Sequence, residues 1–239
     1  VDIPYRMRAL AENDFYFFLR MFSDMQEWRC EDPNHPHLGK LWAEHPFVFE
    51  KARMLQVDYE SGKRRPFINW PRYHLKTTMM KWFVIWLHIK NPHWVALILT
   101  HKVEGTGEHM IRDIKTSIEA TKELHRYWGH IFSASSKDYP LWKGDAFTTL
   151  ANRGGKEPSF SIASIYALPT SMHFDIIVFD DVVVKDTVRN AGAIEACLSG
   201  IRDSIPLYKD DTYAPFLGTR WPPMDPYEEL LNQGDFFDA

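Results

Sequence analysis

The sequence lacks several features that would place it in a common functional class. Its 239 residues include two cysteines, Cys30 and Cys197, which form no spaced set of the kind that binds zinc. The formal net charge of -4 gives no overall basic surface for nucleic acid, so such contact would need a local patch or an assembly. No apolar run is long enough to cross a membrane, and the start does not resemble a signal peptide. A reduced, intracellular setting is the simplest inference.

A metal site near the start of the sequence is also disfavoured. Cys30, His35 and His37 lie close together, but their spacing matches no familiar zinc pattern and no fourth ligand is evident. We predict a proline-rich loop there instead. The first residue is Val1 rather than Met, and we expect the chain to be a piece of a longer protein.

What the sequence does contain is enough apolar surface for a substantial core. Apolar residues make up 45% of the chain and aromatic residues 15%, as in globular proteins. Residues 1–60 are predicted to be a helical N-terminal segment, and residues 61–239 an α/β core. Predicted strands cover residues 66–70, 94–100, 147–152, 159–167, 174–179 and 214–218, the third and fourth joined as a hairpin at Gly154-Gly155. Predicted helices cover residues 76–89, 104–128 and 187–204, and a last one begins near 225.

This alternation predicts a three-layer α/β fold with a mostly parallel central sheet. In such sheets, ligands bind at the carboxyl ends of the strands. The helix over residues 76–89 carries a cluster of apolar residues, which indicates core packing rather than a base-stacking surface. The residues concerned are Trp82, Phe83, Val84, Trp86 and Leu87.

The first chemically informative segment, residues 70–78, follows a predicted strand and opens a helix. A helix start offers free N–H groups and a positive dipole end to a phosphate. Lys76 is placed to reach the outer phosphates, and the Thr77 hydroxyl to ligate magnesium. The usual signature has glycine where this chain has Trp70 and Leu75. Taken alone, the segment fits equally well with an ordinary turn that carries a surface lysine.

The second segment is the apolar strand that ends in Asp180 and Asp181. Two acids directly after a buried strand are costly to hold together unless a cation or water uses them. Asp180 is the predicted magnesium ligand, and Asp181 is predicted to orient or deprotonate the attacking water. A solvated or capping pair of acids is the alternative.

The third segment places Thr219 at the end of the last predicted strand, where its hydroxyl can sense a γ-phosphate. A local backbone cap is the simpler explanation for Thr219 alone. The three segments together, in this order and each at a strand end, predict magnesium-dependent hydrolysis of ATP. The predicted nucleotide contacts are Pro71, Arg72, Tyr73, His74, Leu75, Lys76, Thr77 and Thr78.

Four segments, residues 71–78, 157–160, 174–181 and 218–221, resemble the ATPase domain of the large terminase subunit, which packages DNA into tailed-bacteriophage procapsids. Members of that family depart from the glycine pattern and carry an arginine before the lysine, as Arg72 does here. The resemblance implies a catalytic role for Arg72, and a role for Thr219 in coupling hydrolysis to movement. It also implies double-stranded DNA, a homo-oligomeric ring, a portal protein and a small terminase subunit as partners. Its location would be the host cytoplasm, transiently at the procapsid.

Two departures from the family are evident. No arginine precedes the acidic strand in residues 168–173, so the arginine acting across a subunit boundary has several candidates: Arg153, Arg189, Arg202 and Arg220. The nuclease domain that follows the ATPase in family members is absent from this chain. Two rival functions stay open: a helicase-like P-loop motor, and a degenerate nucleotide-binding or assembly module that does not hydrolyse.

Several other polar residues are assigned to ordinary structural positions. His74 and His101 lie near predicted strand ends and are predicted to be loop histidines, although either can reach a phosphate. Lys102 and Lys115 flank the second helix of the core. We expect them on a solvated face, with contact to a DNA backbone as the alternative.

Overall fold

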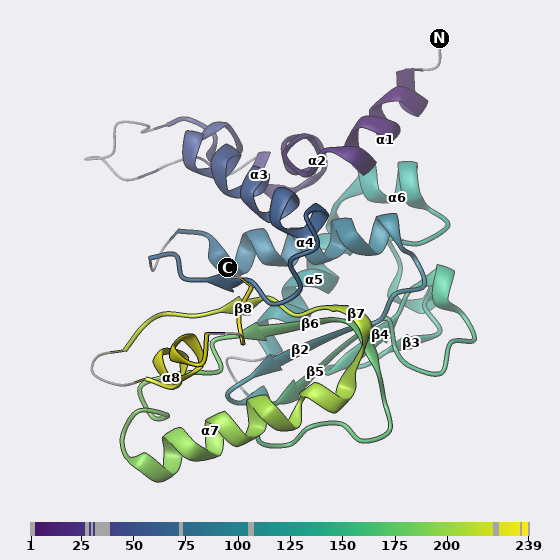
Figure 1. The fold of residues 1–239 in the computed structure, drawn as a ribbon. Helices are drawn as coiled ribbons and strands as arrows, with labels where there is room; N and C mark the ends of the chain where they lie inside the picture. Colours follow the sequence, from purple (N-terminus) through teal and green to yellow (C-terminus); the bar gives the residue numbers. More distant parts are fainter. Residues whose placement is uncertain are drawn as a thin grey trace.

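Three layers form the molecule, with one sheet between two sets of helices (Figure 1). The computed structural model describes residues 3–26, 29, 31, 39–71, 74–104, 108–221, 225–234 and 236–238. Its α-helices are α1 Ile3–Asn13, α2 Phe15–Phe22, α3 Pro46–Glu60, α4 Lys76–Lys90, α5 Glu108–Ala120, α6 Lys122–Trp128, α7 Ala191–Asp203 and α8 Pro226–Asn232. Its strands are β1 Phe67–Ile68, β2 Ala96–Thr100, β3 Leu141–Trp142, β4 Ala146–Thr148, β5 Phe160–Ser164, β6 Phe174–Asp180, β7 Tyr208–Tyr213 and β8 Phe216–Leu217. No helix among these described residues is long and apolar enough to span a membrane.

The central sheet is mostly parallel, which confirms the predicted α/β class. Its strand order is β1-β8-β6-β2-β5-β4-β3, and β7 pairs with β6 beside that path. Neighbouring strands from β1 to β5 are parallel, whereas β4 and β3 are antiparallel. Although β8 comes last along the chain, it lies between β1 and β6. This order brings three strand ends from distant parts of the sequence to one edge of the sheet.

Helix α4 is enclosed on all sides. Every residue from 79 to 89 is buried, because the sheet covers one side of the helix and the N-terminal helices the other. Phe83 packs edge-on against Phe15 of α2, with ring centroids 4.8 Å apart, and Trp82 packs against Phe18 at 6.0 Å. The predicted role of this apolar stretch as core is confirmed. An all-round apolar helix is stable only when it is buried in this way.

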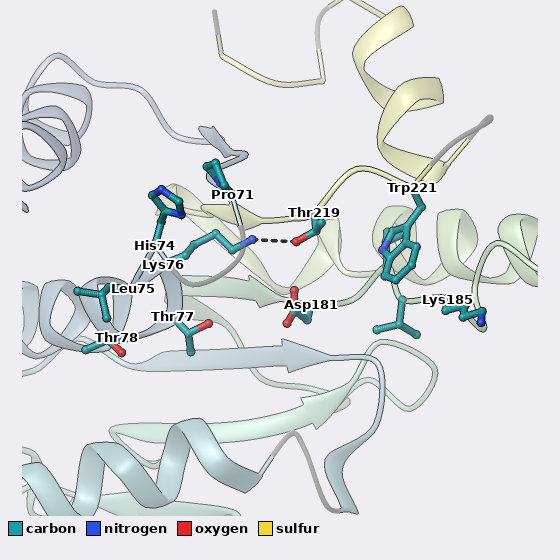
Figure 2. Close-up of a pocket in the computed structure, with 12 residues that line it drawn as sticks. Pro71, His74, Leu75, Lys76, Thr77, Thr78, Asp181, Lys185, Thr219 and Trp221 are labelled. Atoms are coloured by element: carbon teal, nitrogen blue, oxygen red, sulfur yellow. Dashed lines mark hydrogen bonds between the residues drawn. The ribbon is translucent and has the colours of Figure 1, made fainter. Parts of the chain in front are cut away.

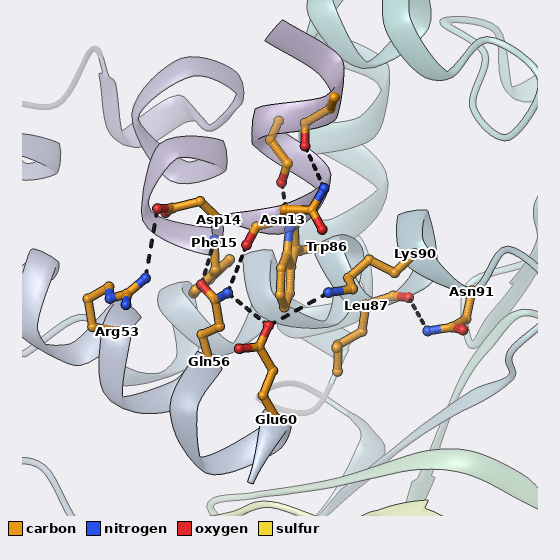
Figure 3. A network of polar contacts seen from close by, with 12 residues as sticks. Asn13, Asp14, Phe15, Arg53, Gln56, Glu60, Trp86, Leu87, Lys90 and Asn91 are labelled. Carbon is orange, nitrogen blue, oxygen red and sulfur yellow. Dashed lines mark hydrogen bonds and ion pairs between the residues drawn. The ribbon is translucent and has the colours of Figure 1, made fainter. Parts of the chain in front are cut away.

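Polar contacts also tie the N-terminal helices to α4 (Figure 3). The buried Gln56 amide of α3 accepts a hydrogen bond from the Phe15 N–H at 3.0 Å and donates to the Asn13 carbonyl at 2.9 Å. It also donates to Glu60 at 2.9 Å, whose carboxylate lies 3.9 Å from the Lys90 ammonium of α4. The start of α2, the end of α3 and the end of α4 are thereby joined, and α1, α2 and α3 share one hydrophobic cluster with the core.

The first strand lies at the edge of the sheet and is covered by residues 236–238. The Phe237 ring stacks on Phe67, with centroids 5.1 Å apart and planes 25° apart. The Asp238 carboxylate accepts hydrogen bonds from the N–H groups of Arg64 and Arg65. Covering an edge strand satisfies backbone groups that would otherwise be open to another chain.

Several predicted element boundaries are wrong. The helix expected over residues 104–128 is two helices, α5 and α6, which meet at Thr121. The expected pairing of residues near 147 and 160 is present as antiparallel β4 and β5, but residues 150–152 form a 3₁₀ helix rather than strand. Strands β3 and β7 were not expected. The middle of β7 is polar and exposed, so it carries no apolar alternation to indicate a strand.

Candidate functional site

Three strand ends meet around one cavity (Figure 2). Strand β8 pairs with β1 through Phe216 and Phe67, and with β6 through Leu217 and Asp180. The turns that follow these strands therefore lie side by side. The cavity has a volume of about 680 Å³ and is lined by Pro71, His74, Leu75, Lys76, Thr77, Thr78, Asp181, Val183, Val184, Lys185, Thr219 and Trp221.

The turn before α4 keeps a glycine-like backbone without glycine. Leu75 has φ 55° and ψ 22°, in the left-handed region, and its carbonyl accepts the Met79 N–H at 2.8 Å. A non-glycine residue in this region costs roughly 1–2 kcal/mol. The Leu75 side chain packs against the main hydrophobic cluster, which helps to hold the conformation. The residue that departs from the usual signature thus adopts the backbone shape that glycine would provide.

Aromatic side chains of the N-terminal segment support this turn from outside. The His74 ring packs edge-on against Phe47, the second residue of α3, with centroids 5.1 Å apart. Phe47 in turn packs edge-on against the buried Trp70 at 5.8 Å. The Lys51 ammonium lies 5.5 Å from the centre of the Phe47 ring. The position of the turn therefore depends on α3 as well as on β1.

Lys76 reaches across the cavity from the first turn of α4 to the end of β8. Its ammonium donates a hydrogen bond to the Gly218 carbonyl at 2.6 Å and lies 3.4 Å from the Thr219 hydroxyl (Figure 2). Lysine supplies three donors on a long flexible stem, so the same ammonium can turn toward an anion in the cavity.

Thr77 and Asp180 form a polar pair beside the cavity. The Thr77 hydroxyl donates to Asp180 Oδ1 at 3.2 Å. Part of Asp180 touches solvent, but its carboxyl group is surrounded by protein atoms. Burial and, after it, repulsion from Asp181 raise the pKa of Asp180 to about 7, although the Thr77 hydrogen bond and Lys76 oppose the rise. A carboxylate in this position is stabilised by an added positive charge.

Asp181 differs from its neighbour in exposure and in backbone shape. It is exposed, lines the cavity and has φ 46°, a left-handed conformation that Asp and Asn tolerate better than most residues. Its N–H donates to the Leu217 carbonyl at 3.3 Å, so β8 fixes the turn in which it lies. Asp181 therefore lines the cavity, whereas Asp180 is held by the Thr77 hydroxyl.

Magnesium suits this set of oxygens. Mg²⁺ is bound through one or two carboxylates, keeps several waters and takes its remaining ligands from hydroxyl or phosphate oxygens. The Thr77 hydroxyl and the Asp180 carboxylate supply such ligands side by side. No group of three or more His, Cys, Asp or Glu side chains arranged for a metal occurs in the described part of the chain. Cys30, His35 and His37 lie outside the described residues.

The segment after β8 is anchored to the start of α8. Buried Asp225 accepts a hydrogen bond from the Arg220 guanidinium at 3.0 Å and from the Trp221 N–H at 2.6 Å. Arg220 also donates to Glu228 at 3.0 Å. Arg220 is therefore held within its own chain, beside Thr219 but directed at α8.

The other candidate arginines are dispersed. Arg202 is paired with Glu229 at 3.0 Å, and Arg153 donates to the Asp138 carbonyl at 3.1 Å. Arg189 lies in the segment between β6 and α7, and 67% of its side chain is exposed. Among these four arginines, Arg189 combines high exposure with a place in the segment that follows the aspartates.

Eight predicted site residues line the cavity: Pro71, His74 and Leu75 before α4, Lys76, Thr77 and Thr78 in its first turn, Asp181 just after β6, and Thr219 just after β8. Asp180 is not a lining residue, and it accepts the hydrogen bond of the Thr77 hydroxyl. Arg72 and Tyr73 lie outside the described residues. Four lining residues were missed, namely Val183, Val184, Lys185 and Trp221. Their positions just after the aspartates and just after Thr219 are the only signal that the sequence offers for them.

Two predictions about surface residues have different outcomes. Lys102 is exposed, as expected, but the solvated face predicted for Lys115 is wrong. Lys115 is 8% exposed, and its ammonium lies over the Trp142 ring, 5.0 Å from the centroid. His101 packs against Tyr166 at 5.2 Å and does not line the cavity.

Comparison with known proteins gives a distant structural likeness. No model of a known protein family matches the sequence, and no curated protein matches it. Among solved structures, the chain is similar to the N-terminal domain of the DNA packaging ATPase from bacteriophage phi29. The two are 14% identical, the match covers 77% of this chain and 86% of that chain, and the TM-score is 0.43. Conclusions about function therefore depend on the geometry of the cavity.

Gly218→Ala should destabilise the protein. A Cβ at Gly218 would lie 2.6 Å from a ring carbon of Tyr227 and 2.8 Å from one of Phe67. Forcing apart the buried Tyr227 ring and the partly buried Phe67 ring costs about 1–3 kcal/mol, which urea unfolding would measure. Gly144→Ala is the matched control, because a Cβ there has no atom within 4 Å. Equal effects of the two substitutions would show that β8 is not held as closely as described.

Proposed function

We propose that the cavity binds a nucleoside triphosphate with magnesium and hydrolyses it. Three observations carry the proposal together: Lys76, Thr77 and Asp181 line one cavity, the Thr77 hydroxyl is hydrogen-bonded to Asp180, and the Lys76 ammonium lies 2.6 Å from the Gly218 carbonyl just after β8. A cation at a helix start, a hydroxyl beside a carboxylate and a second, exposed carboxylate are the groups that phosphoryl transfer to water requires.

Each side chain has a role that follows from its position. Lys76 binds the β- and γ-phosphates, and the N–H groups at the start of α4 assist it. Thr77 and Asp180 hold magnesium, which would neutralise charge on the phosphates. Asp181 faces the opening, where it orients the attacking water and accepts its proton. Arg72, outside the described residues, stays a predicted contributor to the same phosphate site.

Lys76 also connects the phosphate site to β8. Its ammonium is held by the Gly218 carbonyl and lies near the Thr219 hydroxyl. A phosphate is a stronger partner for an ammonium than a carbonyl is, so binding would draw Lys76 away from β8. The Thr219 hydroxyl, which accepts in its contact with Lys76, can donate to the γ-phosphate. Through this exchange Thr219 would sense the nucleotide.

We propose that this site belongs to the motor of a terminase large subunit, which moves double-stranded DNA into a procapsid. Support comes from the order of the motifs at residues 71–78, 174–181 and 218–221 and from their meeting at one sheet edge. Sister subunits in a ring, a portal protein and a small terminase subunit would be its partners, in the host cytoplasm and transiently at the procapsid. DNA-stimulated hydrolysis that produces unwinding would instead identify a helicase-like motor.

Lys76→Ala should weaken binding of Mg-ATP by about tenfold to a hundredfold, since a hydrogen bond to a charged group contributes roughly 1.5–3 kcal/mol. Calorimetry measures the affinity, and circular dichroism checks the fold. Lys122→Ala is the control, because Lys122 is exposed on α6 and does not line the cavity. Unchanged affinity in folded Lys76→Ala protein would overturn the phosphate site, and affinity without any turnover in the assembled wild type would indicate a binding module.

The two aspartates should respond differently to substitution by Asn. Asp181→Asn removes the carboxylate charge that orients and deprotonates the attacking water, and asparagine also tolerates a φ of 46°. We therefore expect that the variant retains Mg-ATP binding and loses hydrolysis. Asp180→Asn should instead raise the magnesium concentration needed for binding. A magnesium titration of nucleotide binding, paired with phosphate release, distinguishes the two. Identical behaviour of both variants would contradict this division of roles.

A neighbouring subunit should complete the site through Arg189. Its side chain is exposed and paired with Asp186 at 2.8 Å, in the segment that follows Asp181. An arginine supplied across a subunit boundary contributes on the order of 10³ or more in rate. We expect turnover per subunit to rise with protein concentration. Mixing Arg189→Ala protein with Asp181→Asn protein should restore activity. Arg153→Ala protein, used in place of Arg189→Ala protein, should behave like wild type. Concentration-independent hydrolysis by a monomer would refute the shared site.

A further inference from the structure

The segment between β6 and α7 carries several groups of the proposed site. It begins at Asp181, its residues Val183, Val184 and Lys185 line the cavity, and Arg189 follows them. The whole segment is described and consists of turns and irregular backbone. Side-chain contacts, rather than the hydrogen bonds of a helix or a strand, must therefore fix its course.

Thr187 closes part of this segment on itself. The residue is fully buried, and its hydroxyl accepts a hydrogen bond from the Val184 N–H at 3.0 Å. Its own N–H donates to the Val184 carbonyl, also at 3.0 Å. These two bonds form a tight turn with Lys185 and Asp186 at its tip. A threonine hydroxyl that accepts one hydrogen bond still has a proton to donate.

A chain of hydrogen bonds leads from Thr187 back to Val182, the residue after Asp181. The Thr187 hydroxyl donates to the Tyr166 oxygen, and the Tyr166 hydroxyl donates to the Cys197 sulfur. The buried Cys197 thiol in turn donates to the Val182 carbonyl at 3.8 Å. The two ends of the turn are thereby joined through one tyrosine, and such connected bonds strengthen one another.

Tyr166 is itself held at the ends of two paired strands. The Ser164 hydroxyl, at the end of β5, accepts the Tyr166 N–H at 3.2 Å and donates to the His101 carbonyl at 2.9 Å. The His101 ring packs edge-on against the Tyr166 ring, with centroids 5.2 Å apart. Strands β5 and β2 pair directly at Ser164 and Thr100. Tyr166 therefore connects the irregular segment to the rigid sheet.

We propose that Tyr166 is a positioning residue, whose hydroxyl holds the segment between Asp181 and Arg189 in place. This inference rests on the proposed function, which gives Asp181 the attacking water and Arg189 a role in the neighbouring subunit. Tyr166 acts through other residues, because it does not line the cavity. A displacement of about 1 Å in a positioned group can cost about a hundredfold in rate. Loosening the segment would therefore slow hydrolysis and leave the phosphate site intact.

The first test removes the hydroxyl and keeps the ring. Tyr166→Phe should lower kcat about tenfold, at a protein concentration that saturates turnover per subunit. Its affinity for Mg-ADP, measured by calorimetry, should be unchanged, because Lys76 and Thr77 are intact. Thermal unfolding followed by circular dichroism checks the fold. Tyr5→Phe is the matched control, since Tyr5 loses the same atom, is 71% exposed and does not line the cavity.

A second variant tests the route through Thr187. Thr187→Val removes the hydroxyl that links Val184 to Tyr166, so its kcat should also fall. A chain of hydrogen bonds that is broken at one link is already open. The double variant should therefore be no slower than the slower of the two single variants. Losses that multiply in the double variant would show independent effects and would overturn the proposal.

The remaining outcomes separate the role of Tyr166 from the proposed function. Wild-type protein that does not hydrolyse Mg-ATP when assembled would overturn the proposed hydrolysis, and the role of Tyr166 with it. With an active wild type, an unchanged kcat in Tyr166→Phe would overturn the role of Tyr166 alone. A joint loss of Mg-ADP affinity and thermal stability in Tyr166→Phe would show that the hydroxyl supports the fold as a whole, which would also overturn its positioning role.

Discussion

Burial of α4 is the constraint on which the rest of the structure depends. A helix that is apolar on every side must be covered on every side. The sheet covers one side, and Phe15 and Phe18 of α2 help to cover the other. Because the helix has so little freedom, its first turn is fixed relative to the strand ends. Lys76 and Thr77 therefore gain their positions from a hydrophobic core that contains none of the reacting groups.

Insertion of β8 between β1 and β6 converts this rigid frame into a site. It places the Gly218 carbonyl 2.6 Å from the Lys76 ammonium and fixes the turn at Asp181. The arrangement carries local costs: Leu75 and Asp181 adopt left-handed backbone conformations, and burial raises the pKa of Asp180 to about 7. Strain and perturbed ionisation of this kind concentrate where chemistry is performed. Both features fall at the same edge of the sheet.

Prediction from sequence succeeded where the signal was local and strong. Buried strands β2 and β6 are mostly apolar runs, and α4 is an apolar helix of standard length, so all three were found. It failed where pairing partners rather than composition decide the structure. Strands β1 and β8 each have two residues, and β7 is polar in its centre, so their boundaries depend on neighbours. Lys115 was misplaced because a lysine whose ammonium lies over Trp142 is, in sequence, like any solvated lysine.

The amino-acid sequence by itself determined the layer architecture, the buried helix and the order of Lys76, Asp180 and Thr219 along the chain, because apolar periodicity and strand-end chemistry are local properties. Only the tertiary structure decided which side chains meet. The contact of Lys76 with Gly218 joins residues 142 positions apart and depends on the order of strands in the sheet. The same holds for the place of Trp221 in the cavity wall, across from residues of the turn before α4, since no local pattern specifies non-local pairing.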